Sequence, residues 1–413
     1  MSAGTGSDGE GPVVVAVEQL RRAVPGGIGR YARGLLDGLR ELGYPAVELL
    51  ASRRRGRDRH RGPDPLTAWG FPVRTSLLPA PFLTAAWDRR LAAVRGARVV
   101  HSVSLAAPPV RPRHAEGGPV IVVTVHDLAW RTHPETTTPR GRRWHESALA
   151  RALEHADAFV VPSAPVAAAL VGAGAPAARV RVIPHGVDHL PVPDVDGAAA
   201  LLRRLGVDDG YLLTAATLEP RKNLGGLVAA FSRARASMAR PWPLVVVGPA
   251  GWGPTSLGVG EESGVLAAGP VDDGVLAALY RGARAFVYVP FTEGFGLPPL
   301  EAMACGVPVV VSTTVPSTTV PSTATPSTTV PSTTMPSTAT PSTTVPSTAA
   351  EGGPEVALRV DPATIDGIAG ALVRAAGDDA LRASLAQRAS AFVAPLTWKA
   401  SAAAHAEWWG SLS

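Results

Sequence analysis

One block near position 300 constrains the fold of this chain more than any other segment. An apolar run at residues 285–290 and a valine-rich run at residues 307–311 each have the composition of a buried strand. Between them, Pro298 and Pro299 preset helical backbone angles in a first turn, where a missing N–H costs little. Gly306 then favours the end of that helix. The block therefore predicts a strand, a turn, a short helix and a second strand in quick succession.

The turn inside this block has the features of a ligand site. Gly294 and Gly296 let the backbone pass close to a bulky ligand with N–H groups pointing outward, and a phosphate group fits the mouth of the helix that follows. Glu293 and Glu301 stand eight positions apart, so both can face one pocket while reaching different parts of a ligand. Carboxylate oxygens beside an anion cradle indicate recognition of hydroxyl groups, as in a nucleotide sugar.

The same alternation of strands and helices continues along the chain and predicts an α/β fold with parallel sheets. Ligands of such sheets bind at the carboxyl ends of the strands. The expected strands are residues 13–17, 97–101, 120–125, 158–161, 211–217, 243–247, 285–289 and 307–311. The expected helices are residues 31–42, 140–155, 223–235, 274–281, 299–305 and 397–410.

The length of 413 residues is enough for two domains with separate cores. The Pro- and Asp-rich stretch at residues 188–209 indicates the boundary. We expect a frayed N-terminus at residues 1–11, a first Rossmann-like domain at 12–197, a second at 198–396, and a C-terminal helix at 397–413. Trp398, Trp408 and Trp409 in that helix are expected to act as core anchors.

Charge and cysteine content narrow the function classes. The net charge is +5, and the excess is almost wholly arginine, since Lys222 and Lys399 are the only lysines. Lys222 stands beside Arg221 in a loop that precedes a predicted helix. Because the chain uses arginine at nearly every other basic position, the lysine indicates that a compact ammonium group matters in this loop. Cys305 is the sole cysteine, which excludes an internal disulfide and fits a reducing, cytoplasmic setting. We expect neither a signal peptide nor a membrane-spanning segment.

The ordered motifs resemble retaining, family-4-type glycosyltransferases with the GT-B fold, in particular bacterial mannosyltransferases of surface polysaccharide synthesis. The block near position 300 resembles the E-x7-E motif of that family, and the similarity extends across nearly the whole chain in the order that the family uses. The segments that carry it are residues 26–31 (GGIGRY), 125–128 (VHDL), 182–188 (VIPHGVD), 218–224 (LEPRKNL), 271–283 and 292–310.

This resemblance implies roles for particular residues. Arg221 and Lys222 would bind the diphosphate and stabilise the leaving nucleotide, Glu293 would bind the donor sugar, and Glu301 would accept hydrogen bonds from the ribose. His126 would line the cleft from the first domain and contact the transferred sugar. The remaining residues expected at the donor site are Gly27, Gly29, Val271, Gly294, Phe295, Gly296 and Leu297.

The implied reaction transfers a hexose, with mannose from GDP-mannose favoured, to a glycan or polyprenyl-diphosphate-linked acceptor. No cofactor and no metal ion is required, and the pair Asp194 and Asp196 in the predicted linker is interpreted as a decoy. His185 departs from the family pattern, which commonly has Asn there. Two alternatives stay open: a nucleotide-sugar epimerase of the same fold, and a catalytically silent binding or scaffold protein.

An arginine-rich segment of the first domain indicates peripheral contact with an anionic membrane, although a solvated loop explains it equally well. It contains Arg53, Arg54, Arg55, Arg57, Arg59 and Arg61, and the aromatic residues Trp69, Phe71, Phe82 and Trp87 follow. No recognised nucleic-acid motif accompanies these arginines, so nucleic acid is not an expected partner.

Residues 314–349 repeat a Pro-Ser-Thr pentapeptide seven times. Proline at every fifth position prevents a packed helix or strand, so we expect an extended, mobile insertion in the second domain. Two interpretations remain, a tolerated surface loop and a segment that gates or impairs the donor site. The insertion also obscures which of Glu351 and Glu355 matches the acidic position of the family.

Overall fold

The computed structural model describes residues 11–22, 26–54, 63–91, 94–108, 118–251, 260, 262–319 and 355–412. Most of the arginine-rich segment, from Arg55 to Arg61, lies outside these residues. So do Glu351 and most of the pentapeptide segment, from position 320 to position 354.

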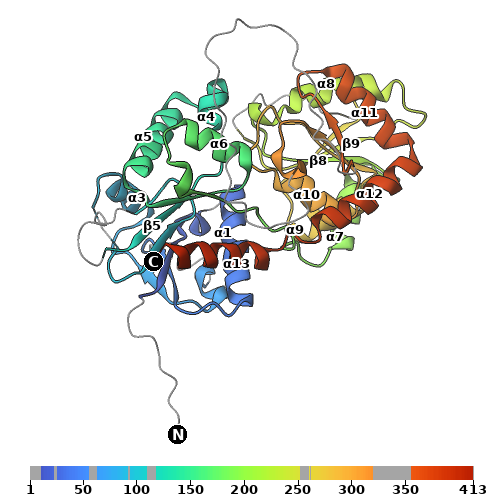
Figure 1. Cartoon of the computed structure of the whole chain (residues 1–413). Coiled ribbons are helices and arrows are strands. Elements are labelled where there is room, and N and C mark those ends of the chain that lie inside the picture. The colour runs from blue at the N-terminus through green and yellow to red at the C-terminus, as the bar shows by residue number, and fades with distance from the viewer. Residues whose placement is uncertain are drawn as a thin grey trace, which may run out of the picture.

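The first domain, coloured blue to green in Figure 1, lies beside the second, coloured yellow to red. It is built on a parallel sheet of seven strands in the order β3-β2-β1-β4-β5-β6-β7. Its strands are β1 (Val13–Ala16), β2 (Val47–Ala51), β3 (Val73–Thr75), β4 (Val99–Ser102), β5 (Val120–Thr124), β6 (Ala158–Val161) and β7 (Val180–Val182). Its helices are α1 (Gly26–Glu41), α3 (Ala80–Asp88), α4 (Ala129–Thr132), α5 (Pro139–His155) and α6 (Ala164–Gly172).

The second domain repeats this plan with six parallel strands in the order β10-β9-β8-β11-β12-β13. Its strands are β8 (Leu212–Ala215), β9 (Leu244–Val247), β10 (Val265–Gly269), β11 (Ala285–Tyr288), β12 (Val309–Ser312) and β13 (Leu358–Val360). Its helices are α7 (Val195–Arg204), α8 (Leu224–Arg235), α9 (Asp273–Gly282), α10 (Leu297–Ala304), α11 (Ile365–Gly377) and α12 (Asp379–Val393). Two parallel sheets, each with helices on both faces, confirm the predicted fold class.

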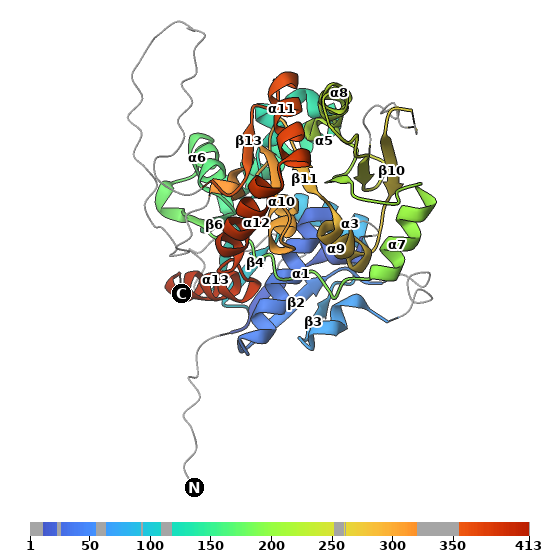
Figure 2. The same cartoon turned by 90° about the vertical axis from the view of Figure 1, so that its right-hand side faces the viewer.

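Central strands such as β1, β5 and β9 are nearly continuous apolar runs because both faces of each sheet are covered. In β1, Val13 and Val15 pack into the core beneath α1, whereas Val14 and Ala16 pack into the core beneath α3. The second sheet is divided in the same way, with α8 and α11 on one face and α9, α10 and α12 on the other (Figure 2).

Two helix boundaries differ from the sequence-based expectation. The glycines expected to form a turn before a helix at residue 31 form the first turn of α1, which begins at Gly26. Helix α7 occupies residues expected to be a linker, and the Asp194 side chain caps it by accepting a hydrogen bond from the Gly197 N–H at 2.9 Å. The apolar spacing of these short segments was too weak a signal to place either boundary.

The C-terminal helix α13 (Trp398–Ser411) leaves the second domain and packs against α1 of the first (Figure 1). Contact is close because two glycines of α1 face it. A Cβ atom at Gly34 would lie 2.1 Å from the Trp398 ring, and one at Gly38 would lie 2.3 Å from the Trp398 carbonyl oxygen. Trp398 and Trp409 are buried, as expected for core anchors, and half-buried Trp408 lies beside Arg181.

The first copy of the pentapeptide is part of the folded domain, which the expectation of an extended segment missed. Residues Pro316–Thr319 form a 3-10 helix, and Pro316, Ser317 and Thr318 are buried. The Ser317 hydroxyl donates to the Gly296 carbonyl at 2.8 Å, and its N–H donates to the Phe295 carbonyl at 3.0 Å. This copy therefore supports the Gly294–Gly296 turn from behind.

The aromatic residues after the arginine-rich segment mostly belong to the core of the first domain. Trp87 is buried, and the Trp69 indole donates to Asp37 at 2.9 Å, whereas Phe82 is 59% exposed. Of the four aromatic side chains, only Phe82 is mostly exposed. None of the helices in the described ranges combines the length and the apolar character needed to cross a bilayer.

Candidate nucleotide-sugar site

Both sheets reverse their strand order at one point, and the predicted site residues gather beside those points. In the first sheet the reversal lies between β1 and β4, and α1 begins on the loop that follows β1. In the second sheet it lies between β8 and β11, and the loops after these strands carry Arg221, Lys222 and Glu293. Ligands of open parallel sheets bind in the crevice at such reversals.

Arg221, Lys222, Tyr288 and Glu293, named here the Lys222 cluster, form a compact charged group. The Lys222 ammonium lies 2.6 Å from Glu293 Oε2 and 2.7 Å from the Tyr288 hydroxyl, and that hydroxyl donates to Glu293 Oε2 at 2.7 Å. Arg221 Nη1 lies 3.2 Å from Glu293 Oε1. Hydrogen bonds and ion pairs within the cluster therefore fix the positions of all four side chains.

The cluster keeps Glu293 ionised. Burial by itself would raise the pKa of this carboxyl group, but Lys222 and Arg221 outweigh burial and lower the pKa to about 2. Burial and the neighbouring Glu293 raise the pKa of Tyr288 well above its usual value, so its hydroxyl stays protonated and able to donate. Glu293 is thus an acceptor of hydrogen bonds and not a proton donor at neutral pH.

The two domains meet directly at this cluster. The Gly294 backbone is so close to the first domain that an added Cβ atom would lie 1.9 Å from the His126 carbonyl oxygen. The Ser163 hydroxyl of the first domain donates to the Gly294 carbonyl at 2.7 Å, and Arg221 Nη1 lies 3.9 Å from Asp127 Oδ2. Gly294 is required here because no side chain fits between the domains.

Glu301 on α10 is the centre of a second group, named the Glu301 cluster, with Arg30, His189 and Tyr280. Its Oε1 atom accepts hydrogen bonds from Arg30 Nη1 at 2.5 Å and from His189 Nε2 at 3.0 Å. Its Oε2 atom accepts one from the Tyr280 hydroxyl at 3.0 Å. Arg30 also binds Asp273 at 2.7 Å, so it bridges α1 to two carboxylates of the second domain.

Glu301 is completely buried and ionised. Burial would raise its pKa, but Arg30 and His189 lower it to about 2. Arg30 itself gains a raised pKa, because the attraction of Glu301 and Asp273 exceeds the effect of its burial. Such a carboxylate can only accept hydrogen bonds.

His126 lies at the carboxyl end of β5, against the second domain. Its Nε2 atom donates to the Val103 carbonyl at 2.9 Å, which leaves Nδ1 as the acceptor of a neutral ring. Burial lowers the pKa of His126, which favours that neutral form. The centre of its ring lies 5.0 Å from that of the Tyr31 ring and 5.7 Å from that of the His185 ring.

His185, which departs from the family pattern, is also buried in this region. Its ring stacks on Trp398 at 5.7 Å and contacts Phe295 at 4.8 Å. Within the described ranges, its Nδ1 atom has no hydrogen-bond partner.

The remaining predicted residues surround the two clusters. Gly27 lies exposed in the first turn of α1, and Gly29 is buried one residue before Arg30. Gly296 has φ +96°, a conformation that favours glycine, and it is the N-cap of α10, whose first residue, Leu297, is buried. Val271 packs at the edge of the second domain's core.

The sequence-based prediction missed Arg30, His189, Tyr280 and Tyr288 as members of these clusters. Arg30 and Tyr280 lie within motifs that carried the resemblance, and His189 follows such a motif directly. Only their contacts distinguish them from other polar residues of the same segments.

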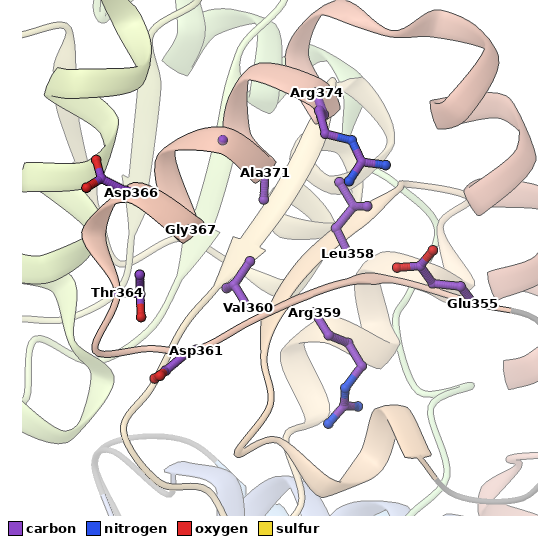
Figure 3. A pocket seen from close by; sticks show the side chains of 11 residues that line it. Glu355, Leu358, Arg359, Val360, Asp361, Thr364, Asp366, Gly367, Ala371 and Arg374 are labelled. Carbon is purple, nitrogen blue, oxygen red and sulfur yellow. The ribbon is translucent and has the colours of Figure 1, made fainter. Parts of the chain in front are cut away.

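A separate hollow of about 470 Å³ lies beside β13 and α11. Figure 3 shows side chains that line it, among them Arg359, Asp361 and Thr364. None of the predicted site residues lines it. The side chain of Arg359 there donates to the Thr318 hydroxyl of the first pentapeptide copy at 2.7 Å and to the carbonyl of Thr313, just before the repeat, at 2.9 Å.

Two family profiles match the two halves of the chain. Residues 25–189 match the family described as Glycosyltransferase Family 4, and residues 203–320 match the family described as Glycosyl transferases group 1. The first match covers β2 to β7 of the first sheet, and the second covers β8 to β12 of the second sheet.

Curated relatives are similar over part of the chain. O-antigen chain mannosyltransferase B of Escherichia coli is 34% identical over 199 residues, which are 46% of this chain and 52% of that protein. D-inositol 3-phosphate glycosyltransferase of Kineococcus radiotolerans is 38% identical over 157 residues, which are 34% of this chain and 35% of that protein. The chain thus spans about half the length of its curated relatives, or less.

Solved structures are similar over nearly the whole chain. The Anabaena protein HepE in complex with UDP and glucose has a TM-score of 0.65 at 16% identity, covering 97% of this chain and 100% of its own. Sucrose-phosphate synthase from Thermosynechococcus elongatus has a TM-score of 0.67 at 21% identity, covering 98% and 99%. At these identities the similarity concerns the fold.

Proposed function

The chain belongs to the family-4-type glycosyltransferases of GT-B fold, and we propose that it transfers a hexosyl group from a nucleotide-diphosphate sugar to a glycan or lipid-linked acceptor. The observation that carries this proposal is the Lys222 cluster. Two cations and one ionised carboxylate meet there within hydrogen-bonding distance, at the crevice where parallel sheets bind ligands.

The cluster has the charges that diphosphate departure requires. Arg221 and Lys222 stabilise the charge that develops on the leaving nucleoside diphosphate, and their fixed positions reduce the cost of reorganisation. Glu293, with its pKa of about 2, accepts hydrogen bonds from the hydroxyl groups of the donor sugar. Glu301 binds the ribose hydroxyl groups in the same way, once the Arg30 side chain releases the carboxylate.

His126 acts from the opposite domain. Its neutral ring presents Nδ1 as an acceptor for a hydroxyl group of the transferred sugar or of the acceptor. Closure of the domains around Gly294 excludes water from the reacting carbon. Retention of anomeric configuration, by a front-side displacement in which the leaving phosphate takes the acceptor proton, and independence from metal ions complete the proposal.

The names of the Escherichia coli relatives favour mannose, with GDP-mannose as the first donor to test and an acceptor of surface polysaccharide synthesis. The sugar-transfer step would then take place in the cytoplasm. Peripheral contact with an anionic membrane remains a proposal that rests on the arginine-rich segment alone.

The test is a thermal-shift and hydrolysis screen against GDP-, UDP-, ADP- and dTDP-sugars, with Glu301→Ala and Lys222→Ala beside the wild-type protein. We expect stabilisation by one nucleotide series, lost in both variants, with turnover that withstands EDTA and a product of retained configuration by NMR. Absence of binding by every series would overturn the proposal. Binding without turnover on any acceptor would favour a silent binding protein.

A further inference from the structure

A line of hydrogen bonds connects the C-terminal crossing helix to Glu301. The Trp398 indole Nε1 donates to His189 Nδ1 at 3.1 Å, and His189 Nε2 lies 3.0 Å from Glu301 Oε1. Trp398 is the first residue of α13, and His189 lies in the segment that joins β7 to α7. The chain passes between the two domains at both of these places.

The direction of this line follows from the chemistry of the indole. An indole N–H only donates, so His189 Nδ1 must be the acceptor. A neutral imidazole carries its single proton on the other nitrogen, and Nε2–H therefore donates to Glu301. Trp398 thus selects the tautomer of His189 that can hold the carboxylate.

Both ends of the line are fixed by packing. Trp398 packs tightly against α1 at Gly34 and against the interdomain segment at Gly186. A Cβ atom added at Gly186 would lie 2.1 Å from the backbone nitrogen of Trp398. That nitrogen also donates to Asp188 Oδ1 at 2.7 Å, one residue before His189. His189 is 10% exposed at its side chain, and Glu301 is fully buried.

His189 differs from the other two partners of Glu301 in what it can do during binding. Arg30 belongs to the first domain and must leave for a ligand to reach Glu301. Tyr280 lies on α9 of the second domain and holds Oε2 alone. His189, flanked by Val187 and Leu190 in the second domain's core, holds Oε1 and so sets the rotation of the carboxylate plane.

We propose that His189 is a positioning residue for the donor site, which orients Glu301 toward the ribose hydroxyl groups in a tautomer set by the Trp398 indole. This inference rests on the proposed function, in which Glu301 binds the ribose. It goes beyond that function by assigning to the crossing helix a part in the selection of ribonucleotides.

The experiment measures the affinity of the full-length protein for GDP and 2′-deoxy-GDP, or for the matching UDP pair if the protein binds that base, by isothermal titration calorimetry. A correctly oriented carboxylate should give the wild type a preference for the ribonucleotide of roughly 10- to 100-fold, the range of a charge-assisted hydrogen bond. His189→Phe should reduce that preference to about 3-fold or less while leaving the 2′-deoxynucleotide affinity nearly unchanged.

Two further variants separate positioning from folding. His189→Gln, whose amide N–H can still donate to Glu301, should retain most of the preference. Trp398→Phe removes the indole N–H together with part of the ring volume, so the readout is the nucleotide preference and not stability. The preference should fall in the wild-type background but not in the His189→Phe background. Trp408→Phe on the same helix is the matched control, because its indole N–H has no partner within the described ranges.

Each outcome decides between the two proposals. A wild-type preference that survives in His189→Phe would overturn the positioning role and leave the function of Glu301 intact. A wild type without any preference, unchanged by Glu301→Gln, would overturn the ribose-binding role of Glu301 and the inference that depends on it. Equal losses for both nucleotides in all His189 variants would indicate a structural role only.

Discussion

At the residue scale, the two lysines of the chain occupy opposite kinds of environment. Lys222 lies between Glu293 and Tyr288 with 11% of its side chain exposed, whereas Lys399 is half exposed and pairs with Glu41 at 3.0 Å on the surface. Removing the partner of a buried ionised carboxylate destabilises the fold, because the desolvation of that charge is no longer offset. Removing one member of an exposed ion pair changes stability little. The same chemical change should therefore have different effects at the two positions.

We predict that Lys222→Met lowers the free energy of unfolding by about 2 kcal/mol, the cost of leaving a buried charge partly unpaired. Donor affinity should fall at least roughly tenfold, because a cation facing the diphosphate is lost. Lys399→Met is the matched control and should change stability by less than about 0.5 kcal/mol. Urea unfolding and calorimetry measure both quantities, and equal effects of the two variants would contradict this assignment.

At the element scale, α13 is bound to the first domain by a directed chain of buried hydrogen bonds. Trp409 Nε1 donates to His101 Nδ1 at 3.0 Å, so His101 Nε2–H donates to Thr124 at 2.8 Å. Thr124 then donates to the Tyr31 hydroxyl at 3.0 Å, and Tyr31 to His405 Nε2 at 2.9 Å. His405 Nδ1–H ends the chain on the Ser401 carbonyl at 2.7 Å. This single direction of donation requires that His101 and His405 are both neutral.

This chain predicts loss of stability on mild acidification. Burial lowers the pKa of His405 to about 4, below the ordinary value of 6.5 in the unfolded chain. Above about pH 6.5 the ring is neutral in both states and favours neither; below it the unfolded chain takes up a proton that the folded protein cannot. The free energy of unfolding should fall by about 3 kcal/mol from this residue as the pH drops from 6.5 to 4, and then level off.

The measurement is urea unfolding as a function of pH for the wild type and His405→Gln. The variant should be less stable at pH 7.5 and should show a smaller decline between pH 6.5 and 4, although His101, whose pKa burial lowers well below its usual value, still contributes. Because Glu293 and Glu301 have pKa values lowered to about 2, the stability they add is lost only as the pH falls below about 4.5. Identical pH profiles for the two proteins would refute the assignment to His405.

At the scale of the whole molecule, the two domains are held together across the crevice by Arg30. It binds Glu301 and Asp273. Arg30 therefore competes for Glu301 with the ribose hydroxyl groups that Glu301 binds in the proposed function. A competitor of this kind shifts the equilibrium between open and closed domains by its differential interaction with the two states.

We predict that Arg30→Ala opens the molecule and strengthens nucleoside diphosphate binding, by roughly 3- to 10-fold, because the ligand no longer displaces an internal cation. Loss of an arginine near an anion would ordinarily weaken binding, so the sign is informative. Small-angle scattering should report a larger radius of gyration for Arg30→Ala, and calorimetry a lower Kd. Arg33→Ala, on the exposed side of the same helix, is the control. Weaker binding by Arg30→Ala would mean that Arg30 contacts the ligand itself.

Sequence patterns sufficed for the fold class and for much of the candidate site, because apolar runs, glycines and prolines act through local backbone physics. They predicted strands such as β6 and β11 and helices such as α8 and α10 to within a few residues. They did not predict β3 and β13, because strands of 3 residues carry too little pattern and depend on pairing with a neighbouring strand.

The pairing of charges was decided only by tertiary structure. Glu293 and Lys222 were both predicted as site residues, but their contact requires loops from two strands that become neighbours only in the folded sheet. Arg30 and Glu301 are 271 positions apart, and Trp398 and His189 are 209 apart. A local pattern carries no signal for such pairs, because the domains must first fold and then meet.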